Sequence, residues 1–147
     1  MVECNIINAC KNGDIEYVDN FVKNGNNINT TYGLGWTPLT ISIEHERKEM
    51  IEFLLQNGAD VNFISEGWPA LHTAIDLAID SALQEGNNDI EASLMDIILL
   101  LLKNGADVDL EVAGVTPISM ASEYMRNHNG FIPCEKIVTL LREYSKK

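Results

Sequence analysis

Signals for disulfide bonds, secretion and membrane insertion are missing from this sequence of 147 residues. The three cysteines, Cys4, Cys10 and Cys134, are an odd number without a Cys-x-x-Cys pair, which argues against a disulfide framework and a zinc site. The longest strictly aliphatic run, Ile97 to Leu102, is far shorter than the roughly 20 residues that cross a bilayer. No basic segment followed by an apolar one opens the chain. These absences favour a cytoplasmic protein without a membrane partner.

Basic residues are scarce as well. Ten lysines and arginines stand against 22 aspartates and glutamates, which gives a net charge of −12. The field of such a chain repels nucleic acid and anionic membranes and favours a basic protein partner. A role in solubility alone explains the charge equally well, so the composition leaves both interpretations open.

Sequence motifs of enzymes are absent. The chain has no Gly-x-Ser-x-Gly, no P-loop and no His-Glu-x-x-His sequence. Asp107, Asp109 and Glu111 alternate as at the start of a calcium loop, but Val112 stands where that loop needs glycine. We therefore expect no enzymatic activity, no cofactor and no metal.

The chain does contain a repeated string. LLQNGADVN, from Leu54 to Asn62, returns 47 residues later as LLKNGADVD, from Leu101 to Asp109. Asn-Gly pairs at 24–25, 57–58 and 104–105 each follow an apolar helical stretch. Glycine tolerates the left-handed conformation that ends a helix, so each pair predicts a helix end. A short extended piece and a second glycine, Gly35, Gly67 or Gly114, then follow.

A helix-capping signal follows the second glycine and predicts the start of the next helix. It opens with Thr37-Pro38-Leu39 in one copy and with Thr116-Pro117-Ile118 in another. Threonine caps a helix, and proline suits the first helical position. A third copy, from Trp68 to His72, keeps the proline but loses the threonine.

This pattern resembles the ankyrin repeat, a unit of about 33 residues with a Thr-Pro-Leu-His start, two helices and a Gly-Ala-Asp-Val-Asn end. The stretch from Gly35 to Asn62 fits that unit without a gap. The resemblance implies an all-α ankyrin-repeat solenoid of four helix-turn-helix repeats in a single domain, about 1–32, 33–65, 66–112 and 113–147. The first and last copies resemble the caps that such a stack needs.

The third repeat is lengthened between its glycines, by fifteen residues relative to the second. An apolar stripe from Leu71 to Ala82 continues the inner helix to about Gln84. Asp89 is a predicted cap or first-turn acid of an outer helix that contains Ile90 to Leu102. We expect both helices to gain about two turns. A row of alanines allows close approach of a neighbouring helix, namely Ala70, Ala74, Ala78 and Ala82.

The fourth repeat is also longer than the consensus, by about seven residues. Its extension offers Tyr124, Met125, Phe131 and Ile132. We expect the two extensions to pack together, because burying even one such side chain contributes roughly 1.5–3 kcal/mol. The chain is expected to be a monomer, although Met95 and Leu99, if exposed, would favour self-association through the long hairpin.

His72, Asp76 and Asp80 recur at i, i+4 and i+8 along the predicted inner helix. This spacing could bind a divalent metal, and with it support a small hydrolase. The resemblance implies a different role, because a histidine after Pro-x-Leu in ankyrin repeats hydrogen-bonds within the scaffold. His45 and His128 have no nucleophile at a recognisable spacing.

The resemblance also implies where a protein partner binds. Ankyrin repeats bind proteins through finger-shaped loops and the exposed side of the inner helices. Carried over to this chain, the predicted partner-binding residues are Leu34, Trp36, Glu44, His45, Glu66, Trp68, Asp76, Asp80 and Val115. Trp36 and Trp68 either anchor a partner or stiffen the fingers. The acidic residues of this set would orient a basic partner.

The stretch GWPALHTAID with its lengthened hairpin is similar to ankyrin proteins that bacteria encode beside secreted toxins. In that group the ankyrin protein is the cognate immunity protein. This resemblance implies an inhibitor that binds and occludes a basic toxin. The alternatives are a general ankyrin scaffold for another cellular protein and, from a different class, a metal-dependent hydrolase using His72 and the nearby aspartates.

Overall fold

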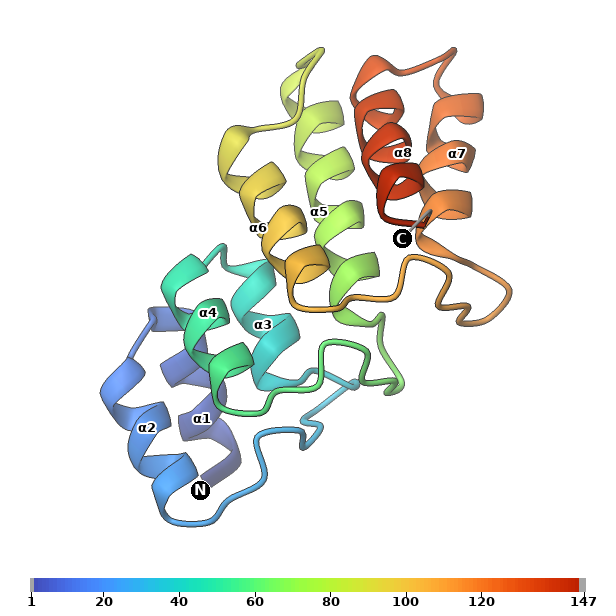
Figure 1. Ribbon diagram of the computed structural model, residues 1–147. Helices are drawn as coiled ribbons and strands as arrows, with labels where there is room; N and C mark the ends of the chain where they lie inside the picture. Colours follow the sequence, from blue (N-terminus) through green and yellow to red (C-terminus); the bar gives the residue numbers. More distant parts are fainter. Residues whose placement is uncertain (1, 146–147) are drawn as a thin grey trace. The chain divides into compact units, whose positions relative to one another are not determined.

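The computed structural model describes residues 2–145, with side chains from Ile6 onward, and shows an all-α fold (Figure 1). Eight helices follow one another in that range; short loops join the two helices of each pair, and the longer segments 24–37, 57–69 and 104–116 join successive pairs. The chain divides into two compact units, Met1–Ala70 and Leu71–Lys147. No helix of the described residues is long and apolar enough to cross a membrane.

The first unit consists of two short helical hairpins. The first hairpin pairs α1 (Val2–Asn12) with α2 (Ile15–Lys23), and the second pairs α3 (Pro38–Glu44) with α4 (Lys48–Gln56). The α1 helix also packs on α3. Ile6, Val18, Ile43 and Leu54 are fully buried between these helices. The apolar periodicity of the sequence therefore forms a core in this unit.

The second unit has longer helices. Its members are α5 (Ala70–Glu85, whose first residue lies in the first unit), α6 (Ala92–Lys103), α7 (Pro117–Asn127) and α8 (Ile132–Ser145). The α7 and α8 helices form a hairpin (Figure 1). The four alanines of the α5 row are all buried, which is consistent with close packing on that side.

The predicted helix starts are confirmed at two equivalent places. Thr37 precedes α3, and its hydroxyl accepts a hydrogen bond from the Thr40 amide at 3.1 Å. Thr116 precedes α7 and accepts in the same way from the Ser119 amide, also at 3.1 Å. Both form capping boxes with proline in the first turn.

The two repeated strings adopt the same local structure. Asn57 and Asn104 cap α4 and α6, and each side-chain amide donates to the carbonyl four residues earlier at 2.8 Å. In the following loops, Asp60 accepts from the Asn62 amide and Asp107 from the Asp109 amide, both at 2.9 Å. The carboxylate of Asp107, considered above for a calcium loop, thus closes a turn that the other copy also contains.

The lengthening of the third repeat is unequal between its helices. The inner helix α5 has 16 residues against 7 in α3, and it ends at Glu85, close to the predicted Gln84. The outer helix α6 has 12 residues against 9 in α4, so the expected gain of two turns is wrong for α6. The remaining inserted residues form the loop 86–91.

Asp89 has a different role from the one predicted. Glu91 is the residue before α6, and Asp89 lies outside the helix. Its carboxylate accepts from Lys136 Nζ of α8 at 2.6 Å. This ion pair lowers the pKa of Asp89. Asp89 therefore links the loop 86–91 to the last helix instead of starting α6.

Two polar contacts join the lengthened hairpins, whereas the apolar packing of their extensions stays a prediction. The Lys136–Asp89 pair is one link, and the Tyr124 hydroxyl donates to Asp76 at 2.9 Å in the other. Phe131 is half-buried, whereas Ile132 is exposed. Met95 and Leu99 are half-buried as well, so neither provides the exposed surface that would favour self-association.

Candidate functional site

The first finger is a tight hairpin between α2 and α3. Tyr32 and Trp36 form an antiparallel bridge, with amide-to-carbonyl distances of 2.7 and 3.0 Å in the two directions. The three residues between them include Gly33 and Gly35, whose φ angles are +57° and +91°. Leu34 stands between these glycines at the tip.

The second finger, between α4 and α5, lies directly against the first. A Cβ atom on Gly35 would come within 2.5 Å of the Gly67 amide nitrogen and 3.1 Å of the Glu66 Cβ. The Ser65 hydroxyl donates to the Gly35 carbonyl oxygen at 2.7 Å. Position 35 therefore requires glycine for two reasons, its positive φ angle and the close approach of the second finger.

Large apolar side chains are exposed on these two fingers. Leu34 is 84% exposed, Ile64 is 55% exposed, and Trp36 and Trp68 are each 37% exposed. These are four of the five large hydrophobic side chains that are exposed among the described residues. We call these four residues and the exposed Glu66 the finger patch; all five lie within the first unit. Clustered apolar surface of this kind is typical of a protein-binding site.

Sequence reasoning placed four of the five residues of the finger patch and missed Ile64. Ile64 follows Phe63 directly, and two adjacent large apolar residues resemble part of a buried core in the sequence. The equivalent residue of the first finger, Tyr32, is half-buried, so a comparison of the two fingers would not have identified Ile64. The two indoles are each about two-thirds covered by the protein, so each has both a packed and an accessible part.

The third finger, in the second unit, has another character. Val112 and Val115 form a two-residue hairpin, in which Ala113 and Gly114 both have positive φ angles of +53° and +78°. This is the backbone geometry of tight hairpins. Val115, a predicted binding residue, is half-buried, and its carbonyl oxygen lies 3.0 Å from His72 Nε2. No large apolar side chain of this finger is exposed.

The end of α3 is not purely acidic. Glu44 is half-buried and His45 is exposed. Arg47 Nε donates to the Lys11 carbonyl oxygen at 2.6 Å, so Arg47 lies against the end of α1. Partial burial and then the charges of Lys11 and Arg47 lower the pKa of His45. Basic groups therefore accompany Glu44, one of the predicted acidic binding residues, at this end of α3.

Asp76 and Asp80 lie on α5 and have different surroundings. Asp76 is half-buried and accepts the hydrogen bond from the Tyr124 hydroxyl, whereas Asp80 is exposed. Burial, followed by the bond to Asp76, raises the pKa of Tyr124 to about 12. Asp76 therefore stabilises the second unit, and Asp80 offers its carboxylate to solvent.

His72 is a buried residue of the scaffold. Its ring is fully inaccessible, and its Nε2 lies 3.0 Å from the Val115 carbonyl oxygen. Burial lowers its pKa, which favours the neutral imidazole. This agrees with the scaffold role that the family resemblance implied. Among the described residues, no group of three or more His, Cys, Asp or Glu side chains could hold a metal ion.

Two cysteines are buried within the described part of the chain. Cys10 is fully buried, as expected for a small core residue, and so is Cys134. Burial raises the pKa of each thiol to about 11. Neither thiol is therefore a nucleophile at neutral pH. The side chain of Cys4 lies outside the described residues.

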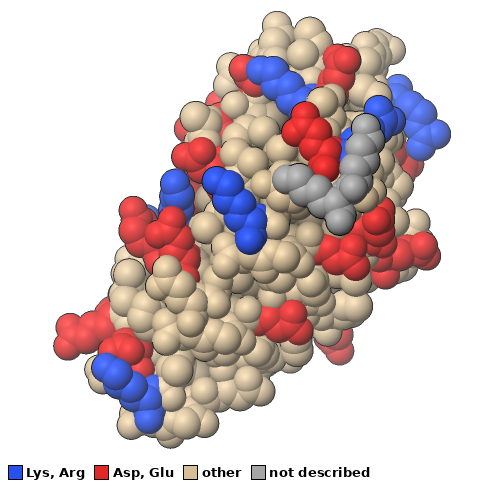
Figure 2. Space-filling view, viewed as in Figure 1, with Lys and Arg blue, Asp and Glu red and all other residues tan. Residues whose placement is uncertain are grey.

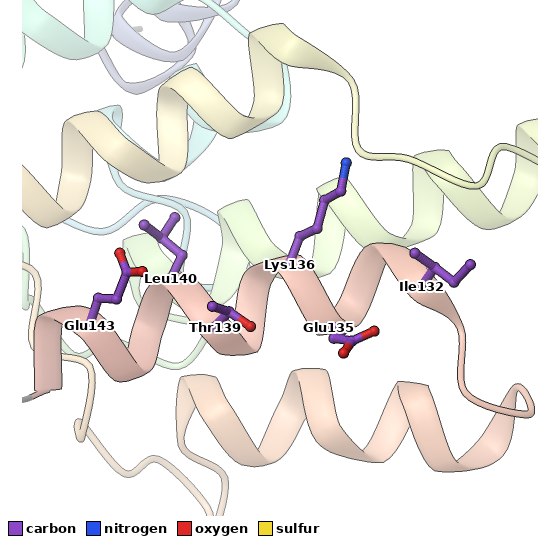
Figure 3. A pocket seen from close by; sticks show the side chains of 6 residues that line it. All are labelled: Ile132, Glu135, Lys136, Thr139, Leu140 and Glu143. Atoms are coloured by element: carbon purple, nitrogen blue, oxygen red, sulfur yellow. The ribbon is translucent and has the colours of Figure 1, made fainter.

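A shallow groove runs along α8. It has a volume of about 450 Å³ and is lined by Ile132, Glu135, Lys136, Thr139, Leu140 and Glu143. Figure 3 shows these six side chains projecting from a single helix. Ligand sites usually gather polar groups from several elements, so we place the candidate site on the finger patch instead.

The charge of the chain is unevenly distributed along its length. Between Lys48 and Lys103 there are ten acidic residues and no lysine or arginine. This stretch contains Ile64, Glu66 and Trp68 of the finger patch. On the face seen in Figure 2, the acidic side chains form several groups, and basic side chains lie between them. The stretch from 49 to 102 is therefore the longest part of the chain without a basic side chain to offset its acidic ones.

Comparison with known proteins assigns the family. The model of ankyrin repeats (3 copies) matches residues 6–90. The mouse protein named ankyrin repeat, SAM and basic leucine zipper domain-containing protein 1 is 27% identical over 115 residues, which cover 78% of this chain and 22% of the mouse protein. An ankyrin repeat protein of fowlpox virus is 33% identical over 141 residues, covering 77% of this chain and 41% of the viral protein. The chain thus spans from about a fifth to two-fifths of the length of these relatives. Ankyrin repeats are typically non-catalytic modules for binding other proteins, and this chain belongs to the ankyrin-repeat family.

Proposed function

We propose that this ankyrin-repeat protein inhibits a basic protein toxin by binding it through the finger patch. The observation that carries the proposal is the exposure of four large apolar side chains and the acidic Glu66 on two fingers that touch at Gly35 and Gly67, the apolar residues being Leu34, Trp36, Ile64 and Trp68. Exposed apolar and aromatic side chains provide the binding energy of protein interfaces. Acidic surroundings steer and orient a basic partner.

The mechanism is occlusion. Tight inhibition by a rigid module requires an interface of about 1,600 Å² in total. The finger patch supplies its apolar centre, and acidic residues nearby, such as Asp60, supply part of a polar rim. Neither step needs a catalytic group, a metal or a cofactor on this protein, and the proposal treats the chain as a cytoplasmic monomer with a single ankyrin domain.

The decisive experiment is growth rescue. The chain is expressed together with the toxin encoded beside its gene, and survival of the host is measured. We expect survival with the wild-type chain and its loss with Ile64→Ser. Ile132→Ser is the matched control, because Ile132 is 53% exposed and lies outside the patch. Equal loss of rescue by the two variants would contradict the assignment of the site.

A general scaffold is the competing function within the same class. Both functions predict that affinity purification from the native cell recovers a protein. Only the inhibitor recovers a basic protein that is lethal when expressed alone. Recovery of an acidic or harmless protein, retained by wild type and lost by Ile64→Ser, would assign the chain as a scaffold.

A hydrolase that uses His72 is disfavoured by position. The imidazole is fully buried and bonded to the Val115 carbonyl oxygen, and Asp76 is bonded to Tyr124. Metal analysis and a hydrolysis assay on the purified protein test this alternative.

A further inference from the structure

We propose that the finger patch recognises an arginine side chain of its partner in preference to lysine. This inference rests on the proposed function and specifies the chemistry of the partner segment. Its occupant is an extended stretch of a basic protein in which arginine stands beside aliphatic residues.

The first support is the position of Glu66. A Cβ atom on Gly35 would lie 3.1 Å from the Glu66 Cβ, so Glu66 branches from the second finger next to the glycine that separates Leu34 from Trp36. Its side chain is exposed. Within the described part of the chain, the Glu66 carboxylate has no hydrogen bond or ion pair. An acceptor thus starts from the point at which the two apolar fingers touch.

The second support is the pair of indoles. Trp36 and Trp68 each follow one of the two glycines that meet at the finger tips, and each retains an accessible part. A guanidinium group stacks on an indole ring and forms two parallel hydrogen bonds with a carboxylate. An ammonium group matches neither planar geometry.

The third support is the apolar surface around these groups. Leu34 and Ile64 are the most exposed large hydrophobic residues described in this chain. The aliphatic stem of an arginine lies readily along such surface while its charged head pairs elsewhere. The sequence from 49 to 102 contains no lysine or arginine, so no basic side chain close in sequence is there to pair with Glu66 in place of the partner.

The chain offers a direct probe of this site, because its only two tryptophans both lie in the finger patch. Three acetylated and amidated tripeptides are titrated, with arginine, lysine or citrulline between two leucines. Binding is followed by tryptophan fluorescence and by the two indole N–H signals in an NMR spectrum. Citrulline keeps the shape of arginine and removes its charge.

We expect the arginine peptide to bind about fivefold more tightly than the lysine peptide, since only arginine stacks and pairs at once. The citrulline peptide should bind about tenfold more weakly than the arginine peptide. Glu66→Gln should reduce arginine affinity about tenfold and abolish the preference over lysine. Glu49→Gln, which removes another exposed glutamate of this unit outside the finger patch, is the matched control and should leave the preference unchanged. Thermal melting should be the same for both variants.

Equal affinity for all three peptides, or an unchanged preference in Glu66→Gln, would overturn the inference. So would indole shifts that depend on protein concentration alone, because a second copy would then occupy the patch. Toxin binding with no arginine preference refutes this inference and leaves the proposed function intact. If the peptides show the arginine preference but the chain neither binds nor inhibits a toxin, the proposed function is refuted and this inference stands.

Discussion

The two units of the chain differ in what their side chains do. The first unit exposes large hydrophobic residues, and the second forms polar contacts within itself. In Met1–Ala70 the helices are short, and the fingers hold four exposed large hydrophobic residues. In Leu71–Lys147 the helices are longer, and the polar groups of its lengthened repeats form internal links, such as His72 with Val115 and Asp89 with Lys136. The comparison teaches that extra length in a repeat need not enlarge a binding surface; here it adds contacts within the unit.

The largest effect is expected from the shared core position of the repeated strings. Leu54 and Leu101 are equivalent and both fully buried. Replacing either with alanine should cost about 2–5 kcal/mol of unfolding free energy. Urea denaturation measures this for each variant. If 1–147 is a single domain, both variants shift one common transition, and two separate transitions would contradict that expectation.

The next largest loss of stability is expected from alanine substitutions at two glycines of the first finger, which should differ in size. Gly33→Ala places a side chain in open space and should cost about 1–2 kcal/mol from its backbone conformation alone. Gly35→Ala meets the same conformational cost and the Gly67 backbone as well, and should add about 1 kcal/mol or more for overpacking. Thermal and urea unfolding of the pair provide the comparison. Equal losses would show that the two finger tips do not touch.

A pH effect should appear in the second unit. Burial lowers the pKa of His72 below its ordinary value of 6.5, so the unfolded chain binds the proton more readily. Its contribution to stability is complete above about pH 6.5 and decreases as the pH falls below that value, with a slope of at most about 1.4 kcal/mol per pH unit. Unfolding measured between pH 7.5 and 5.5 should show this slope in wild type.

The matched variant for this effect is His72→Gln. Glutamine does not titrate, and its amide can still donate to the Val115 carbonyl. The variant should be less sensitive to pH over the same range, even if it is less stable throughout. An unchanged slope would assign the pH dependence to other groups.

The smallest effect should follow from the link between α7 and α5. Tyr124→Phe removes the hydroxyl that donates to Asp76. Because the ring remains in place, we expect a loss of about 1 kcal/mol. Asp76→Asn retains an acceptor and should cost less. A loss in Tyr124→Phe as large as that in Leu101→Ala would mean that the ring itself is displaced.

The local signals in the sequence predicted most of the fold. The Thr-Pro starts, the Asn-Gly ends and the length of α5 depend on capping groups, backbone conformation and apolar spacing within a few residues. The length of α6 could not be predicted in this way. Asp89 is a good capping residue by type, but its pairing with Lys136, 47 positions away, holds it in a loop.

The candidate site was predictable in part for a similar reason. The finger position and aromatic type identified Trp36 and Trp68. Their degree of burial depends on neighbouring backbone that only the structure reveals. The basic residues around His45 were also missed, because Lys11 precedes it by more than thirty positions and approaches it through the packing of α1 on α3 and the contact with Arg47.

The hydrogen bonds that end the helices also bear on how this protein ages. Deamidation of an Asn-Gly pair begins when the glycine nitrogen attacks the asparagine side-chain carbonyl, after which ammonia leaves. At Asn104 the side-chain amide is held by the Leu100 carbonyl oxygen, and the Gly105 amide is directed to the Leu102 carbonyl oxygen. Both reacting groups are thereby restrained in the folded protein. We expect conversion to aspartate at this pair to be slow in the folded protein and to accelerate once the chain unfolds.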